Sequence, residues 1–239
     1  MAQSPKTSPQ KSALIVGTGS GISAAFARAL HRDGWKLVLA SRKPDQFADL
    51  TREVGAHSIA VDASDAAQVA AMFAEIDRVA GPLDLALYNA SFRTRGAFVD
   101  LVPEDVQKAL TVSAFGAFLV AQEAAKRMVA RGTGAIFFTG ASASVKGYPQ
   151  SAPFAMAKFA LRGLAQSMAR ELQPKGIHIA HFIIDGGVKN ATRGRPEPSN
   201  APESLLDPQA IADTYMHTLK QPRSAWSLEV ELRPWVEQF

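Results

Sequence analysis

One helix-opening segment carries the residues with the clearest chemistry in this chain of 239 residues. It reads Ser151-Ala-Pro-Phe154-Ala-Met-Ala-Lys158, with an aromatic side chain four residues before a lysine. A lysine ammonium donates up to three hydrogen bonds, whereas a phenylalanine ring has no titratable group and cannot move a proton. Acid–base chemistry at this segment therefore needs a group other than the aromatic residue.

A glycine-rich turn near the N-terminus is the second chemical feature. The run Leu14-Ile-Val-Gly17-Thr-Gly19-Ser-Gly21-Ile22-Ser23 precedes a helical pattern over residues 22–31. Glycines at a strand-to-helix turn bring backbone N–H groups close to a pyrophosphate, which the helix N-terminus attracts. This favours dinucleotide binding over the alternative of a tight structural turn. The predicted contacts are Gly17, Gly19, Ser20, Gly21 and Ile22.

The next apolar run ends in Ala40-Ser41-Arg42-Lys43 and indicates which dinucleotide is bound. NAD enzymes commonly place a carboxylate here for the adenosine ribose, and a carboxylate repels a 2′-phosphate. Arg42 can grip such a phosphate with two N–H groups, and Ser41 can donate a hydrogen bond. We therefore predict NADP(H), held by Ser41, Arg42 and Lys43. A solvated basic loop is the alternative.

The elements that must position these residues form an alternating series. Short apolar runs alternate with longer helical patterns, which indicates βαβ units and an α/β fold with a parallel sheet. We expect one domain over residues 11–239, a doubly wound Rossmann fold with helices on both faces. The expected strands are 13–16, 36–40, 58–61, 83–88, 135–139 and 177–184, with an edge strand near 227–232. A helix is expected after each of the first six strands, the longest over 103–131 and 151–173.

Composition excludes several classes of function. Hydrophobic residues make up 47% and charged residues 20%, as in globular proteins, and no apolar stretch approaches the ~20 residues that span a bilayer. The net charge is +4, but the basic residues are scattered, so we expect an anionic small molecule and neither nucleic acid nor a membrane. The absence of cysteine fits a reducing cytoplasm. Residues 1–10 are polar and predict a disordered tail.

Together these motifs resemble the short-chain dehydrogenase/reductase family over nearly the whole chain, from about residue 11 to residue 239. Gly17 and Gly21 match the first two glycines of its Thr-Gly-x-x-x-Gly-x-Gly turn, while Val16 and Ser23 replace its threonine and last glycine. The resemblance implies a nicotinamide-dependent oxidoreductase. It also implies a homodimer or homotetramer formed through the two long helices.

The resemblance also implies cofactor contacts at later strand ends. Asp62 and Ala63 border the adenine in such enzymes, and Asp62 can also serve as a helix N-cap. Asn89-Ala90 matches part of the family's Asn-Asn-Ala-Gly. After the sixth strand the family has Pro-Gly, an aliphatic residue and a threonine, where this chain reads Asp185-Gly-Gly-Val-Lys-Asn-Ala-Thr192. The implied contacts there are Gly186, Val188 and Asn190, with Thr192 as the alternative to Asn190.

The family's catalytic tetrad of Asn, Ser, Tyr and Lys is incomplete in this chain. Ser113 stands at the asparagine position, Ala141 at the serine position beside Ser142, and Phe154 at the tyrosine position. Lys158 alone is kept, and the resemblance implies that it binds the nicotinamide ribose. A positioned general acid contributes about 10²–10⁴ in rate. That contribution must come from another group or be absent.

Several polar groups could replace the missing phenol, although each is also explained as a hydrogen-bonded structural residue. Tyr148 lies six residues before Phe154 and could reach inward. A proton relayed from Lys158 through a water molecule is a further alternative. The other candidates are Ser142, Ser144, Tyr88, Ser91 and Arg93. Asp185 could accept a proton, but Asp-Gly-Gly is also typical of a turn.

Three functions are compatible with these observations. The first is an NADP(H)-dependent oxidoreductase of an atypical branch, acting on a small carbonyl, alcohol or activated alkene. The second is a catalytically silent NADP(H)-binding sensor or scaffold, and the third is chemistry other than hydride transfer. The survival of the cofactor motifs favours the first.

The proline-rich stretch 192–208 predicts a substrate loop or lid, with a passive connection as the alternative. His178 and His181 lack metal-ligand spacing, so no metal is expected.

Overall fold

Seven parallel strands form a single twisted sheet in the computed structural model, which describes residues 10–237. The strand order is β3-β2-β1-β4-β5-β6-β7, as in a doubly wound α/β fold. The strands are β1 (Ser12–Val16), β2 (Lys36–Ser41), β3 (His57–Ala60), β4 (Leu85–Tyr88), β5 (Gly134–Thr139), β6 (Ile177–Ile184) and β7 (Glu229–Leu232). The predicted fold class is therefore confirmed. The tail prediction lies outside the described residues except for Gln10, whose amide donates to the Gly34 carbonyl at 2.8 Å.

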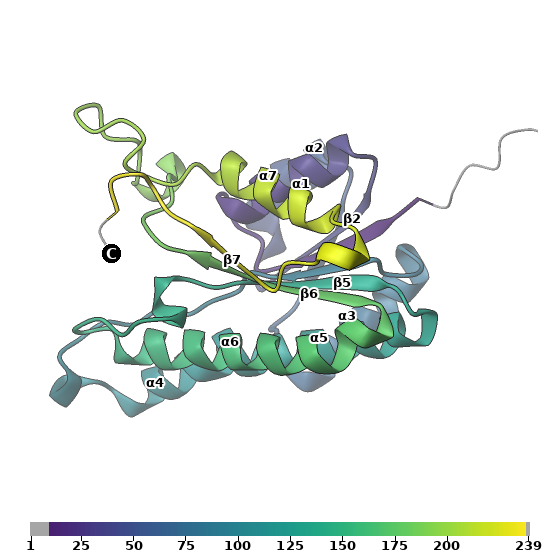
Figure 1. The fold of residues 1–239 in the computed structure, drawn as a ribbon, viewed down its shortest axis with the longest axis horizontal. Helices are drawn as coiled ribbons and strands as arrows, with labels where there is room; N and C mark the ends of the chain where they lie inside the picture. The colour runs from purple at the N-terminus through teal and green to yellow at the C-terminus, as the bar shows by residue number, and fades with distance from the viewer. Residues whose placement is uncertain (1–9, 238–239) are drawn as a thin grey trace, which may run out of the picture.

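Helices cover both faces of the sheet (Figure 1). One layer contains α1 (Ile22–Arg32), α2 (Ala48–Glu53) and α7 (Pro208–Leu219), and the other contains α3 (Ala66–Val79), α4 (Pro103–Leu110), α5 (Gly116–Arg131) and α6 (Ala152–Leu172). Each layer buries its own apolar cluster against the sheet. Among the described residues, no helix is long and apolar enough to cross a membrane.

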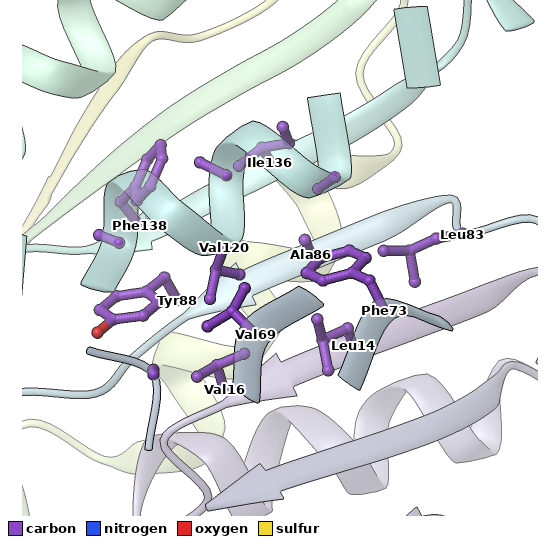
Figure 2. Close-up of a cluster of buried hydrophobic side chains, with 14 of the residues drawn as sticks. Leu14, Val16, Val69, Phe73, Leu83, Ala86, Tyr88, Val120, Ile136 and Phe138 are labelled. Carbon is purple, nitrogen blue, oxygen red and sulfur yellow. The ribbon is translucent and has the colours of Figure 1, made fainter. Parts of the chain in front are cut away.

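Alternate residues of the central strands supply the core beneath α3 and α5 (Figure 2). Successive side chains of a strand point to opposite faces, so every second residue contributes to each cluster. The residues gathered on this face include Leu14, Val16, Ala86, Tyr88, Ile136 and Phe138 from the strands and Val69, Phe73 and Val120 from the helices. Burial on both faces explains why these strands are continuous apolar runs.

The long helix predicted over residues 103–131 is interrupted by a π-helical segment at Thr111–Phe115. The Gly116 N–H donates to the Thr111 carbonyl, five residues back, and the Tyr88 hydroxyl donates to the Val112 carbonyl. Gly116 is needed because a Cβ there would lie 2.5 Å from the Tyr88 hydroxyl. The helix thus gives up its regular hydrogen bonds where it meets β4. Such π segments are frequent at functional sites.

The order of the strands reverses between β1 and β4. From β1 the chain runs outward to β2 and β3, and then it returns to β4 on the other side. Crossovers therefore diverge at the carboxyl ends of β1 and β4, which opens a crevice there. The Val16 carbonyl accepts from the Asn89 N–H at 2.8 Å, so the ends of the two strands are held together at this point.

Candidate active site

A cleft of about 950 Å³ lies at the carboxyl ends of β1, β2 and β4. Residues from the glycine turn, the end of β2, the end of β3 and the segment after β4 line it, together with the loop after β6. The predicted cofactor residues that line it are Gly17, Gly19, Gly21, Ile22, Ser41, Arg42, Lys43, Asp62, Ala63, Asn89, Ala90, Val188 and Asn190. The fold thus gathers residues from five strand ends into one space. Ser20, Gly186 and Lys158 are not among the lining residues.

The glycine turn is shaped by one very close backbone contact. Gly17 has φ +88°, and a Cβ there would overlap the backbone of Ala90 after β4. The Gly17 N–H donates to the Ala40 carbonyl at 2.9 Å. No side chain caps the start of α1 at Gly21, so the first N–H groups of this helix are available to an anion from the cleft.

Ser23, which stands at the family's last glycine position, links the turn to β4. Its hydroxyl donates to the Gly17 carbonyl at 2.9 Å and accepts from the Asn89 amide at 2.8 Å. The structure shows that its hydroxyl is fully engaged and fixes the orientation of Asn89 at the switch point. The separation of 66 residues between Ser23 and Asn89 hides this contact from local sequence patterns.

Three polar or charged residues at the end of β2 line the cleft, namely Ser41, Arg42 and Lys43. The Ser41 hydroxyl is buried and has no hydrogen-bond partner among the described residues. Arg42 and Lys43 are exposed beside it. The buried donor and the two cations fit a phosphate group, which supplies acceptors and negative charge. Asp62 lines the same end, and hydrogen bonds from Ser64, with a smaller contribution from Arg42, lower the pKa of its carboxyl.

Asp62 is not the helix cap that was considered from sequence. The N-cap of α3 is Asp65, whose carboxylate accepts from the N–H groups of Ala67 and Gln68. Asp62 instead accepts from Ser64, from the backbone N–H at 3.0 Å and from the hydroxyl at 2.6 Å. Its own N–H donates to the Gln68 side chain at 2.9 Å. This network orders the β3–α3 turn along the cleft.

Lys158 lies in the second turn of α6 with its ammonium group inside the protein. Only 3% of the residue is exposed, and Nζ donates to the Thr139 carbonyl at 2.8 Å. Nζ also lies 5.7 Å from the centre of the Phe154 ring. Burial lowers the pKa of Lys158 to about 8. No carboxylate offsets this effect among the described residues, so the charge is held at a cost to stability.

We predict that stability rises with pH because of Lys158. The pKa of an unfolded lysine is about 10.4, so between about pH 8 and pH 10 the unfolded chain binds more protons than the folded protein. The free-energy cost of burying the charged Lys158 ammonium is complete below about pH 8 and disappears above about pH 10. In urea unfolding, Lys158→Met should remove on the order of 2 kcal/mol of this rise. The exposed control Lys36→Met should leave it unchanged; equal pH dependence in all three proteins would contradict the buried charge.

Ser113, at the family's asparagine position, is fully buried in the π segment. Its hydroxyl accepts from the Phe92 N–H at 3.1 Å and lies 3.3 Å from the Ser91 hydroxyl. These contacts hold the chain that follows β4. Ser113 does not line the cleft, although Ser91 and Val112 do. Ser113 therefore lies behind the wall of the cleft, in contact with residues that follow β4.

The other candidate proton donors lie at different depths. Ser142 is partly exposed in a short turn after β5. Ser144 is buried and lies 3.3 Å from Nε2 of His181, whose pKa falls to about 4 through burial and the nearby Lys158 charge. Tyr148 is 43% exposed, lies near Lys146 and does not line the cleft. The structure thus does not bring Tyr148 inward, and it leaves Ser142 as the accessible hydroxyl of this turn.

Gly186 and Asp185 both lie against the C-terminal segment of the chain. The Asp185 carboxylate is buried between Arg233 Nη2 at 2.9 Å and Lys146 Nζ at 3.4 Å, so it anchors the C-terminal segment. A Cβ at Gly186 would lie 2.7 Å from Pro234, because the same segment covers this glycine. Among the described residues there is also no group of three or more His, Cys, Asp or Glu side chains that could hold a metal.

The loop after β6 crosses the cleft and contacts the glycine turn. The Asn190 amide and the Thr192 hydroxyl donate to the Ser20 hydroxyl at 3.2 and 2.8 Å. Lys189, just before the proline-rich stretch, forms ion pairs with Glu197 and Asp207 within it, and these pairs connect the two ends of the loop. Ten residues line the cleft that were not among the predicted cofactor contacts, namely Val16, Thr18, Ser23, Gln46, Phe47, Val61, Ser91, Val112, Arg193 and Arg195. The basic pair in the proline-rich stretch was the signal for the last two.

Comparison with known proteins agrees with this architecture. The family model described as short chain dehydrogenase matches residues 11–198. An uncharacterized oxidoreductase of Staphylococcus aureus (strain N315) is 26% identical over 227 residues, covering 94% of this chain and 97% of that protein. A short-chain dehydrogenase from Rhodopseudomonas palustris is 33% identical with a TM-score of 0.81, covering 94% of this chain and 99% of that one.

An alcohol dehydrogenase from the archaeon Thermococcus sibiricus has a TM-score of 0.85 over 96% of this chain and 98% of that one. At 24% identity this likeness shows the fold alone. The family model covers most of the chain, including the glycine turn, the lysine segment and the switch point between β1 and β4. The chain therefore belongs to the short-chain dehydrogenase family of oxidoreductases.

Proposed function

We propose that this protein is an NADP(H)-dependent oxidoreductase with an incomplete catalytic tetrad, acting on a small carbonyl, alcohol or activated alkene. The observation that carries the proposal is the end of β2, where the unpartnered Ser41 hydroxyl lies beside Arg42 and Lys43 at the cleft. A 2′-phosphate satisfies all three groups. The Thermococcus sibiricus enzyme noted above, which shares this fold, was solved in complex with 5-hydroxy-NADP.

The remaining residues of the cleft suit the rest of the dinucleotide. The N–H groups at the start of α1, with Gly19, Ser20 and Gly21, would hold the pyrophosphate. Asp62 and Ala63 would border the adenine. Lys158, Asn89-Ala90, Val188 and Asn190 would hold the nicotinamide riboside. NADP(H), when bound, supplies or accepts the hydride.

Proton handling must differ from that of relatives that keep the tyrosine. Phe154 cannot donate a proton, and Ser113 is engaged with Phe92 and Ser91. In this proposal Ser142 polarises the substrate oxygen, and Lys158 supplies the proton through a water molecule. A pKa of about 8 leaves Lys158 mostly protonated near neutral pH, which suits an acid. For an activated alkene, the proton comes from solvent.

An NADPH absorbance assay with matched aldehydes, ketones and activated alkenes tests this function. The protein should oxidise NADPH with at least one of these substrate classes and should bind NADPH more tightly than NADH. A control with Arg42→Ala should lose NADPH oxidation at low cofactor concentration. Micromolar NADPH binding without any turnover would instead favour the second candidate.

That second candidate is a catalytically silent NADP(H)-binding sensor or scaffold. Its support is the engagement of the former catalytic positions in structural contacts: Lys158 donates to Thr139, and Ser113 accepts from Phe92. A loop that closes on the cofactor could then transmit its presence. The segment 192–208 fits such a lid, because Arg193 and Arg195 line the cleft and the Thr192 hydroxyl donates to Ser20 of the glycine turn.

We also propose a cytoplasmic homodimer or homotetramer formed through α5 and α6. Exposed apolar side chains on this face support it, namely Phe115, Phe118, Met156 and Phe159. Phe115 and Phe118 stack with ring centres 6.1 Å apart. The absence of cysteine supports the reducing compartment.

Substitution of this apolar face should dissociate the oligomer. The double variant Phe118→Asp/Phe159→Asp places charges where a partner helix would pack, and buried unpaired charges are strongly unfavourable. Sedimentation should show the wild type as a dimer or tetramer and this variant as a monomer. The surface control Arg52→Asp, on α2 in the other helix layer, should sediment like the wild type. A monomeric wild type would contradict the proposed assembly.

A further inference from the structure

The Phe154 ring contacts two cations rather than a catalytic partner. The Arg93 guanidinium carbon lies 4.9 Å from the ring centre, and Lys158 Nζ lies 5.7 Å from it. The face of an aromatic ring attracts a cation, and a guanidinium can also stack on it. Phe154, at the family's tyrosine position, therefore acts as a platform on which the Arg93 guanidinium lies.

Two further arginines gather near Arg93. Arg95 follows it in the segment after β4, and Arg195 comes from the loop after β6 and lines the cleft. Nη1 of Arg195 lies 3.8 Å from the position of a Cβ on Gly187. Partial burial and the charges of Arg95 and Arg195 lower the pKa of Arg93. Two segments far apart in the sequence thus bring three positive charges together.

The part of the chain that the structure describes does not neutralise these charges. Within residues 10–237, no carboxylate forms an ion pair with Arg93, Arg95 or Arg195. Other arginines do have such partners, as in Arg28–Glu53, Arg127–Asp77 and Arg162–Glu229. Mutual repulsion among clustered cations is relieved when an anion binds between them.

Other residues are available to bind the phosphates of the proposed cofactor. Arg42 lies at the end of β2, and Arg193 Nη2 lies 3.5 Å from the position of a Cβ on Gly19 in the glycine turn. We infer that Arg93, Arg95 and Arg195 bind an anionic group of the substrate, a carboxylate or a phosphate monoester. The inference rests on the proposed function, because it assigns this anion to the molecule that is oxidised or reduced.

Calorimetric titration of the NADP⁺-loaded protein with benzoate, phenyl phosphate and the neutral benzamide tests the inference without turnover. At least one anion should bind about tenfold more tightly than benzamide, since hydrogen bonds between charged groups are strong. The tighter of the two anions identifies the group that is recognised. Arg93→Met should bring anion affinity down to that of benzamide, and Arg93→Lys should restore part of it.

Further variants distinguish the contribution of the Phe154 ring from that of the Arg93 charge. Phe154→Leu should weaken anion binding by about threefold through loss of the cation–π contact, whereas Phe154→Tyr should not. Arg170→Met, which removes an exposed arginine on α6, should have no effect. The inference would be overturned if benzamide and both anions bound with equal affinity, or if Arg93→Met kept full anion affinity. In either case, binding of NADP⁺ by the wild type would leave the proposed function standing. Failure of the wild type to bind NADP⁺ would overturn both.

Discussion

Arg42→Glu should lower NADPH affinity by about 10²–10³-fold and leave NADH affinity nearly unchanged. A charge-assisted bidentate contact with the 2′-phosphate contributes roughly 1.5–3 kcal/mol, and a carboxylate in its place adds repulsion. The Ser41 hydroxyl, buried without a protein partner, and Lys43 cannot compensate for this reversal of charge. Fluorescence titration with both cofactors measures the ratio directly.

Two controls make this result specific to the 2′-phosphate. NADH lacks that group, so its affinity reports any general damage to the cleft. Arg78→Glu changes charge by the same amount on α3, on a side chain that is mostly exposed and outside the cleft. Parallel losses for NADPH and NADH in Arg42→Glu would show that Arg42 supports the cleft rather than the phosphate.

Gly17→Ala should cost about 3 kcal/mol of unfolding free energy and abolish cofactor binding. The residue has φ +88°, where alanine is strained by roughly 1–2 kcal/mol, and its Cβ would overlap the backbone of Ala90. Relief of such overpacking typically costs a further 1–3 kcal/mol. Any shift that relieves it separates β1 from β4 at the switch point, where the cofactor would bind.

Gly34→Ala is the matched control for this substitution. Gly34 has φ +80°, yet nothing lies within 4 Å of a Cβ placed there. It should therefore show only the conformational cost, about 1 kcal/mol, and keep cofactor affinity. Urea unfolding of both variants separates backbone strain from the clash with Ala90. Similar losses in the two proteins would mean that the close approach at Gly17 carries no special cost.

The fold could be predicted from sequence because its elements are encoded locally. Parallel strands buried on both faces are continuous apolar runs, and β6 was predicted with its observed bounds, Ile177–Ile184. Ends were less well defined: β4 begins at Leu85 and not at residue 83, and β7 begins at Glu229. Leu83 is buried without pairing in the sheet, so its apolar character could not place the strand end.

Contacts between distant segments could not be predicted in this way. Phe154 is visible in the sequence as a missing hydroxyl, but its contact with Arg93 depends on how α6 packs against the segment after β4. The break in the helix at Thr111–Phe115 depends on the Tyr88 hydroxyl, which comes from a different element. Ser113 likewise is identified from its place between Val112 and Gly116 in the sequence, whereas the hydrogen bond that it accepts from Phe92 is a tertiary feature.

We propose that this protein keeps the cofactor site of its family and has changed its proton chemistry at several positions together. The most direct measurement is the single-turnover rate of ketone reduction by NADPH-saturated wild type and Phe154→Tyr. With Ser113 and Ala141 still in place, the restored phenol should increase the rate by less than about tenfold. An increase of about 10²–10⁴, the full contribution of a positioned general acid, would contradict the claim.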